Sequence, residues 1–525
     1  MPRFFHKWIL SVLSIALCCV LTGCLNSNLD DNHMDDLIGI DGAEGLSPSE
    51  PSSEQSLPTT FSLPIQAGET LDPFSAGDGI QQLLTPLLYE GLFELDEQFA
   101  PQKLLCSDYT ASADFKIWTI TLRNDAVFSD GSPLTAADVT ASYQQARQSP
   151  RFQARFANVE SIHADQNGRV VFRLREGNNR FPSLLDIPIV QRSTLGKAAP
   201  IGTGPYYYVQ ENSSKTLQQN PHWPNRASLP LKTISLVTVD ESTTLSHLFS
   251  GHEIQMVTTD YIGNSPTSYK GAAAVTEAPT TTMQYLGFNC RNGLFTDPAL
   301  RHAVSLGIDR SSIHQAYFSG HSLSAAFPVS PLSEWYPADL DPGYSAAAFH
   351  NAMEKAGYTS GRHHNVRLLV CDGNSFRISA ARAIAAALSV YDLKVQLQIL
   401  PYDAYLEALQ SGNFDFYYGE VRMTPDFNCA PLLKTNGSLN YGGFSDPVLD
   451  AQITSAFTTS GALRGSNNAM MSTIRDTAPI VPLGFKSLSV VLQGGVVDAI
   501  TPTCANPFYQ FSQWKMNIKG EIING

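Results

Sequence analysis

The chain has 525 residues, of which 43% are hydrophobic and 16% are charged, and its formal net charge is −14. This length accommodates two or three domains with ordinary cores, and the composition excludes a disordered chain or a multi-span membrane protein. An acidic chain repels the phosphates of nucleic acids and of anionic lipids, so we expect no nucleic-acid partner.

The N-terminal residues have the pattern of an export signal. Arg3 and Lys7 flank the start of the apolar run WILSVLSIALCCVL, which is shorter than the about 20 residues needed to cross a bilayer core. The run is followed by LTGC, which resembles a bacterial lipobox and implies that residues 1–23 are a signal peptide and that Cys24 is lipidated. An uncleaved anchor helix is the alternative. We therefore expect an extracytoplasmic protein held at the membrane, on a cell surface or in a periplasm, by an N-terminal lipid.

Residues 24–60 follow as an acidic stretch that is rich in Asp, Ser, Pro and Glu, and residues 25–60 contain no Lys or Arg. Such a segment buries too little apolar surface to offset its ordering entropy. We interpret it as a disordered tether, with the folded part of the chain beginning near Phe61.

Five cysteines remain beyond Cys24. Their number is odd, they are scattered, and no C-x-x-C pair occurs, so they do not form a disulfide framework or a zinc site. One or two bridges and buried free thiols both stay open for Cys106, Cys290, Cys371, Cys429 and Cys504. We expect no metal and no cofactor.

A strand, a turn and a helix are predicted between Phe115 and Ala146. Apolar and polar residues alternate in the strand, and Gly131 suits a left-handed position in the turn SDGSP. Thr135 is a good N-cap for the helix, with Asp138 three residues later. Each of these residues has a structural explanation, so none is assigned to catalysis.

An α/β unit is predicted later in the chain. The run VRLLV (366–370) indicates a buried strand, residues 375–391 have helical spacing after an N-cap at Ser375, and residues 394–400 alternate as a strand. A crossover of this kind makes a parallel pair. The region from about 290 to 478 is therefore expected to be an α/β lobe.

A second helix is expected to end at Gly412 and to lead into a strand at 414–421. In open α/β sheets, ligands bind beyond the carboxyl ends of the strands. Asp426 lies just past such an end.

Nine motifs in order resemble the family 5 extracellular solute-binding proteins of ABC importers, the group that binds oligopeptides and dipeptides. The most specific motif is VFSDGSPLTAADV, and the resemblance extends from about Phe61 to the C-terminus. The motifs are LDPF (71–74), YEGL (89–92), VFSDGSPLTAADV (127–139), GTGPY (202–206), YLGFNC (285–290), FTDPALRHAVSLGIDRSSI (295–313), GNFDF (412–416), NYGGFSDPVLD (440–450) and APIVPL (478–483).

The resemblance implies an α/β clam-shell of the periplasmic-binding-protein type, with two lobes and mixed sheets. Lobe I would comprise residues 61–95, 196–285 and 479–525, with an extra subdomain at 96–195. Lobe II would be residues 286–478, and the chain would cross between the lobes near Tyr285 and Ala478. Closure of the lobes on a ligand would create the form that a permease recognises.

The resemblance also implies a ligand role for Asp426. Relatives that bind peptides carry an aspartate there that holds the α-ammonium of the ligand. Asn428 also agrees with their pattern, whereas Met423 replaces an expected aromatic residue. A turn role for Asp426 and an ion pair with Arg422 are the alternatives.

Four further residues are ligand candidates. Arg422 could bind a ligand carboxylate, or it could be a surface residue. Tyr285, Tyr441 and Phe485 fall near the expected hinge or cleft, where they could clamp a ligand or pack in the core.

Other chemistry has little support in the sequence. The pair His363 and His364 suits a solvated loop better than a metal site, and HEIQM at His252 lacks a second histidine ligand. No G-x-S-x-G motif, P-loop or dinucleotide loop occurs.

We therefore expect a monomeric, lipid-anchored receptor, not an enzyme, that binds short peptides and delivers them to an ABC permease. A binding protein for a nickel chelate or a sugar is the alternative, and a secreted hydrolase is a more distant one.

Overall fold

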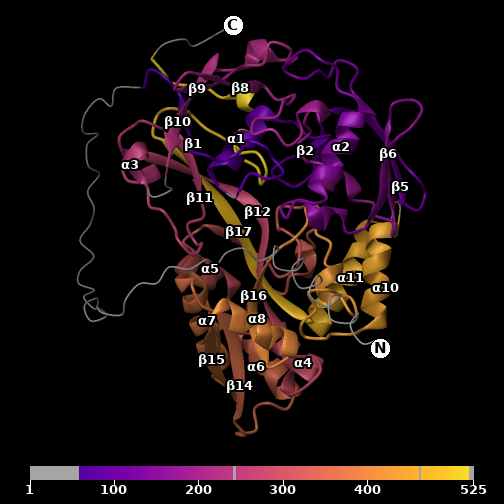
Figure 1. Ribbon diagram of the computed structural model, residues 1–525. Helices are drawn as coiled ribbons and strands as arrows, with labels where there is room; N and C mark the ends of the chain where they lie inside the picture. The colour runs from indigo at the N-terminus through magenta and orange to yellow at the C-terminus, as the bar shows by residue number, and fades with distance from the viewer. Residues whose placement is uncertain (1–57, 78, 241–243, 460–462, 520–525) are drawn as a thin grey trace, which may run out of the picture.

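The computed structural model describes residues 58–77, 79–240, 244–459 and 463–519. The expected signal peptide, the lipidation site at Cys24 and the tether up to residue 57 lie outside these residues. In the described part of the chain, no helix combines the length and the apolar character needed to cross a membrane. The chain forms two lobes, one above the other in Figure 1.

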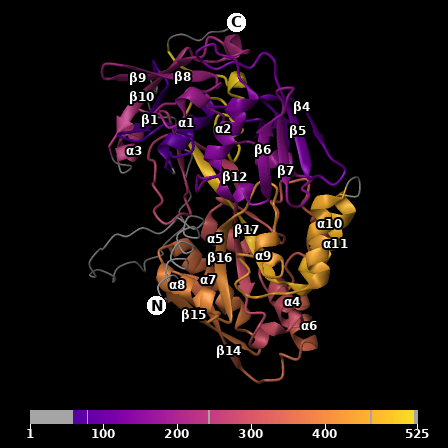
Figure 2. The same cartoon turned by 45° about the vertical axis from the view of Figure 1, so that its right-hand side comes forward.

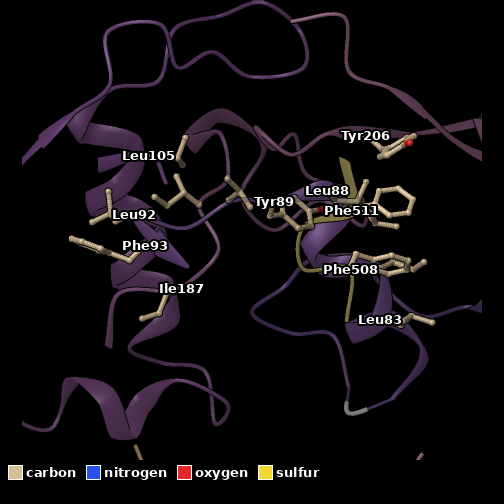
Figure 3. Packing of buried hydrophobic residues seen from close by; sticks show 14 of the residues in the cluster. Leu83, Leu88, Tyr89, Leu92, Phe93, Leu105, Ile187, Tyr206, Phe508 and Phe511 are labelled. Carbon is tan, nitrogen blue, oxygen red and sulfur yellow. The ribbon is translucent and has the colours of Figure 1, made fainter. Parts of the chain in front are cut away.

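Lobe I is built on a four-stranded sheet with the order β1-β10-β9-β8, in which β1 and β10 run parallel. Its elements are β1 (Ser62–Gln66), α1 (Ile80–Leu88), β8 (Tyr206–Glu211), β9 (Ser214–Gln219), β10 (Thr233–Val239) and α3 (Leu245–Ser250). The C-terminal segment returns to this lobe, where Phe508 and Phe511 pack near Tyr206 and the end of α1 (Figure 3). The two ends of the described chain therefore share one hydrophobic core.

An extra subdomain of lobe I contains an antiparallel sheet with the order β4-β5-β7-β6. Its elements are β2 (Phe93–Leu95), β3 (Pro101–Lys103), β4 (Cys106–Ala111), β5 (Ile117–Leu122), α2 (Ala136–Ala146), β6 (Val159–Ala164) and β7 (Val170–Leu174). The sequence predictions for this region are confirmed. Thr135 and Asp138 form a capping box at the start of α2, and Gly131 has a φ of 83°.

Lobe II is built on a seven-stranded mixed sheet with the order β11-β17-β12-β16-β14-β15, to which β13 adds through β17. This sheet extends into lobe I at β11, where Met256 lies in the lobe I core. The strands are β11 (Met256–Thr259), β12 (Ala273–Phe288), β13 (Ser322–Ser324), β14 (His364–Cys371), β15 (Leu393–Leu400), β16 (Phe416–Arg422) and β17 (Ile480–Gln493). The helices are α4 (Pro298–Leu306), α5 (Arg310–Phe318), α6 (Ala346–Lys355), α7 (Ser375–Leu388), α8 (Tyr402–Ser411), α9 (Ala430–Leu433), α10 (Pro447–Thr458) and α11 (Leu463–Thr477).

The predicted α/β unit is confirmed, because β14 pairs parallel with both β15 and β16. Helix α8 ends at Gly412 in the left-handed conformation, with a φ of 73°. The N-cap of α7 differs from the expectation. The side chain of Asn374, one residue before Ser375, accepts a hydrogen bond from the backbone N–H of Arg377.

Two long antiparallel strands, β12 and β17, run from one lobe to the other (Figure 1). Val481 and Leu483 at the start of β17 lie in a core cluster of lobe II, whereas Val490 and Leu492 near its end lie in the core of lobe I. The crossing thus lies inside β17, a few residues after Ala478. The pairing of its partner strand β12 is irregular between Pro279 and Tyr285.

Candidate ligand-binding site

A cavity of about 990 Å³ lies between the lobes. Lobe I contributes the segment after α1, the residues around Arg155 and the C-terminal residues 504–513. Lobe II contributes β16 and the residues that follow it, through Pro425. The crossing strands supply Tyr285 and Lys486 to the wall. The cavity therefore includes the carboxyl end of β16, as the open-sheet rule predicts.

Aromatic residues and glycines alternate on the paired strands β12 and β16 at the cavity wall. Tyr285 is paired with Gly419, and Gly287 is paired with Tyr417. A Cβ atom on Gly419 would lie only 2.6 Å from the ring of Tyr285, so glycine makes room for this ring. The hydroxyl groups of Tyr285 and Tyr417 are 3.4 Å apart, and the ring centroid of Tyr441 lies 6.3 Å from that of Tyr417. These residues form an apolar wall with hydroxyl groups.

A network of charged groups lies where the strands cross. Glu420 accepts a hydrogen bond from the side chain of Gln284 and pairs with Arg377 at 3.2 Å and Lys486 at 3.9 Å. Lys486 also bonds Asp260. Burial raises the pKa of the Glu420 carboxyl, but the cations Arg377 and Lys486 outweigh it, so the pKa is lower than usual. The carboxylate is ionised, and its charge is neutralised within the protein.

Two acids stand on the lobe I wall. The indole N–H of Trp223 donates to Glu90 over 3.0 Å, and the amide of Asn506 donates to Glu94 over 2.5 Å. Burial raises the pKa of Glu90 to about 7 and also raises the pKa of Glu94. Glu90 can therefore exchange a proton near neutral pH.

A third group of charges surrounds Cys504, a half-buried thiol on the cavity wall. Asp186, Arg422 and Arg155 all act electrostatically on it, and Arg155 is paired with Asp186. Arg422 is solvent-exposed at the end of β16, and it lines the cavity.

Asp426 is engaged by protein groups and is absent from the cavity lining. Its carboxylate accepts hydrogen bonds from the side chains of Asn178 at 2.9 Å and Thr424 at 2.5 Å, and from the backbone N–H of Asn428 at 3.3 Å. Arg180 donates to the carbonyl oxygen of Asp426. Asn178 of the extra subdomain thus occupies the carboxylate in this structure, and the contact with a ligand ammonium stays a prediction. The geometry agrees with the turn alternative, and in the described residues no ion pair joins Asp426 to Arg422.

The other candidates divide between cavity and core. Tyr285, Tyr441 and Arg422 line the cavity. Phe485 is fully buried and packs against Phe427, and the side chain of Asn428 accepts from the backbone N–H of Ala430, so neither is part of the lining.

The cysteines and the histidine pair were also considered in the sequence. The five cysteines from Cys106 to Cys504 are free thiols. His364 opens β14, and within the described ranges no group of three His, Cys, Asp or Glu side chains is arranged to hold a metal ion.

Sequence reasoning missed the charged groups of the wall. Glu90 lies in the motif YEGL, where its position between apolar neighbours was a usable signal. No local signal in the sequence marked Asp260, Arg377 and Lys486, because these residues come together from segments that are far apart in the sequence.

Comparisons with known proteins support this architecture. The profile of the bacterial extracellular solute-binding proteins, family 5 (middle), matches residues 100–435. The glutathione-binding protein GsiB of Salmonella typhimurium is 26% identical over 316 residues, which are 56% of this chain and 60% of that protein. GsiB of Escherichia coli O157:H7 is 25% identical over the same shares. The chain thus spans about 60% of the length of the curated relatives it matches.

Solved structures share the fold at low sequence identity. The unliganded open form of the periplasmic murein tripeptide-binding protein MppA has a TM-score of 0.73 at 19% identity, covering 88% of this chain and 98% of that one. A nickel ABC transporter protein from Bacillus halodurans has a TM-score of 0.71 at 17% identity, covering 87% and 99%. The fold is therefore the two-lobed clam-shell of periplasmic-binding-protein-like receptors. The chain belongs to the family 5 bacterial extracellular solute-binding proteins, which serve transport as binding proteins and are not enzymes.

Proposed function

We propose that the protein is a lipid-anchored receptor that captures short peptides between its lobes and delivers them to an ABC permease. The observation that carries this proposal is the cavity of about 990 Å³ with walls from both lobes. This volume is at the upper end of the range for small-molecule sites, about 300–1,000 Å³, so a single amino acid would leave much of it unfilled. A chain of a few residues fits its size.

The lining supports a peptide as the solute. Tyr285, Tyr417 and Tyr441 offer ring faces and hydroxyl groups, which suit a ligand with both apolar and hydrogen-bonding parts. Charged pairs surround them, so a zwitterion finds both signs of charge. Glutathione, which the names of the curated relatives give as their ligand, is itself a tripeptide.

The crossing strands support a closing motion. Among the strands of the described residues, β12 and β17 are the pair whose length reaches both lobes, and the register of this pair is irregular near Tyr285. A solute that contacts both walls gains contacts when the lobes close, so it favours the closed form by its differential affinity. A permease that recognises the closed form would then bind the receptor together with its solute.

The anchor rests on the N-terminal pattern that ends at Cys24. Expression in a bacterial host with a labelled fatty acid should label the parent protein and leave Cys24→Ala unlabelled and unattached to membranes. Labelling of the alanine variant would contradict lipidation at this residue.

Calorimetry tests the solute class. The mature protein is titrated with a pool of short peptides and, separately, with nickel–histidine, because a nickel chelate is the rival solute. A heat of binding that is observed with the peptides and not with nickel–histidine supports the proposal. A heat of binding that is observed with nickel–histidine and not with the peptides refutes it. Solution scattering in the same samples should show compaction with the peptides, and mass spectrometry should recover them intact.

A further inference from the structure

Arg422 is a cation of the cavity wall with no protein partner. Its guanidinium is exposed, and among residues 58–77, 79–240, 244–459 and 463–519 no group forms a hydrogen bond or ion pair with it. Protein groups already engage the other cations of the cavity wall, which are Arg151, Arg155, Arg377 and Lys486. A guanidinium presents two parallel N–H donors, the geometry that a carboxylate accepts.

The acids of the lobe I wall near Arg422 are engaged by other groups. Asp186 is paired with Arg155, and Glu94 accepts a hydrogen bond from Asn506. In the described residues no acid forms an ion pair with Arg422, so an anionic group of a bound solute would find this cation available.

The carboxylate that the family resemblance assigns to a ligand ammonium is occupied. Both oxygens of Asp426 accept hydrogen bonds, one of them from Asn178 of the extra subdomain. Arg180 adds a cation beside it, held between the rings of Trp335 and Phe457 at 4.1 Å and 4.6 Å. A solute ammonium would have to displace these groups, and Asp426 itself is only 2% exposed.

We propose that Arg422 binds a carboxylate of the solute and that Asp426 joins lobe II to the extra subdomain instead of binding the solute's ammonium. The inference rests on the proposed function and narrows it. The solutes are short peptides that are recognised through a carboxylate, which in an unsubstituted peptide is the C-terminal one.

The test compares two pools of tri- to hexa-alanine, one with free carboxyl termini and one with amidated termini. The parent protein should bind the free-acid pool at least about tenfold more tightly, since a charge-assisted bidentate contact is lost on amidation. Arg422→Met should bind the free-acid pool about tenfold more weakly and should no longer distinguish the pools. Arg382→Met is the matched control, because Arg382 is an exposed arginine of lobe II outside the cavity, and it should behave as the parent does.

A third pool, with acetylated amino termini, tests Asp426. We expect acetylation to lower the affinity by the same factor, if at all, in the parent and in Asp426→Asn. A loss of tenfold or more in the parent that disappears in Asp426→Asn would overturn the assignment of Asp426.

The outcomes separate the inference from the proposed function. If the parent binds the acid and amide pools equally, the peptide function stands, but the contact between Arg422 and the solute carboxylate is refuted. A preference for the acid pool that persists in Arg422→Met overturns it as well. If the parent binds none of the pools, both the peptide function and the contact at Arg422 are refuted.

Discussion

The side-chain amide of Asn178 donates to the carboxylate of Asp426 over 2.9 Å, although 248 residues separate them in the sequence. Beside this bond, Asn179 donates to the carbonyl oxygen of Ala456 near the end of α10, and Lys434 pairs with Glu176 at 3.5 Å. Figure 2 shows α10 and α11 below β6 and β7, the strands of the extra subdomain. The contact joins the two lobes at the side of the cavity.

Arg180 should be the strongest single contributor to this contact. It is 4% exposed, donates to the side chain of Asn467 over 3.0 Å, and stacks between Trp335 and Phe457. Arg180→Ala removes the cation from two rings and leaves buried acceptors unpaired. We expect the free energy of unfolding to fall by about 2–4 kcal/mol.

Urea denaturation measures this change through the transition midpoint and slope. Arg226→Ala is the control, because Arg226 is an exposed arginine of lobe I with no side-chain bond to the described residues, and it should change stability by no more than about 0.5 kcal/mol. Equal midpoints for the two variants would show that the contact does not stabilise the molecule.

Glu90 should make stability depend on pH. Burial raises its pKa from 4.5 to about 7 in the folded protein, so the unfolded chain releases the proton at lower pH than the folded one. The stabilisation from the neutral carboxyl is fully present below pH 4.5 and is lost as the pH rises through about 7. We expect a loss of roughly 1–3 kcal/mol across this range, at about 1.4 kcal/mol per pKa unit.

Glu90→Gln isolates the effect, since glutamine can still accept from Trp223 but does not titrate. The difference in unfolding free energy between the parent and this variant should change between pH 4.5 and about pH 7. Glu69→Gln, at an exposed acid of lobe I, should show no such change. Parallel pH profiles for the parent and the Glu90→Gln variant would contradict the raised pKa.

Local patterns predicted much of the fold. The parallel unit of β14, α7 and β15 and the capping box at Thr135 follow from residues close together in the sequence. The N-cap of α7 was wrong by one residue, because both Asn374 and Ser375 can cap a helix and the sequence does not rank them.

The site was less predictable. Arg422 and Tyr285, two of the candidates named from the sequence, line the cavity. The partner of Asp426 was not predicted, because the extra subdomain brings Asn178 to it from a distant part of the chain. Whether an acid meets a ligand or another side chain depends on such long-range packing, which spacing along one strand does not encode.

Gly442, in the motif NYGGFSDPVLD, should be essential for packing beside β12. A Cβ atom there would overlap the carbonyl oxygen of Phe288, and the backbone N–H of Cys290 donates to Gly442 over 2.9 Å, so the backbone has little freedom to move away. Gly442→Ala should lower the free energy of unfolding by about 2 kcal/mol or more.

Gly465→Ala is the matched control for this substitution. Gly465 lies in α11, is exposed, and has open space where a Cβ atom would stand. Alanine should therefore stabilise the helix by about 0.5–1 kcal/mol. Thermal denaturation of both variants checks the pair, and two shifts of the same sign would contradict the account of Gly442.

Tyr441 should contribute to solute affinity through its ring. It lies on the lobe II wall of the cavity, half-buried, with its ring at 82° to that of Tyr417. A peptide in the cavity would lie against the exposed part of this ring. Tyr441→Ala should weaken peptide binding about tenfold, which corresponds to about 1.4 kcal/mol, whereas Tyr441→Phe should retain most of the affinity.

Calorimetry with the free-acid alanine pool measures both variants against Tyr344→Ala, which removes a tyrosine of lobe II that is 50% exposed and lies outside the cavity. Thermal denaturation of the same samples separates lost contact from lost folding, because Tyr441→Ala should remain folded at the titration temperature. If Tyr441→Ala binds as tightly as Tyr344→Ala, the solute does not contact the ring of Tyr441. Peptide binding would then have to rest on β16 and the lobe I residues across from it.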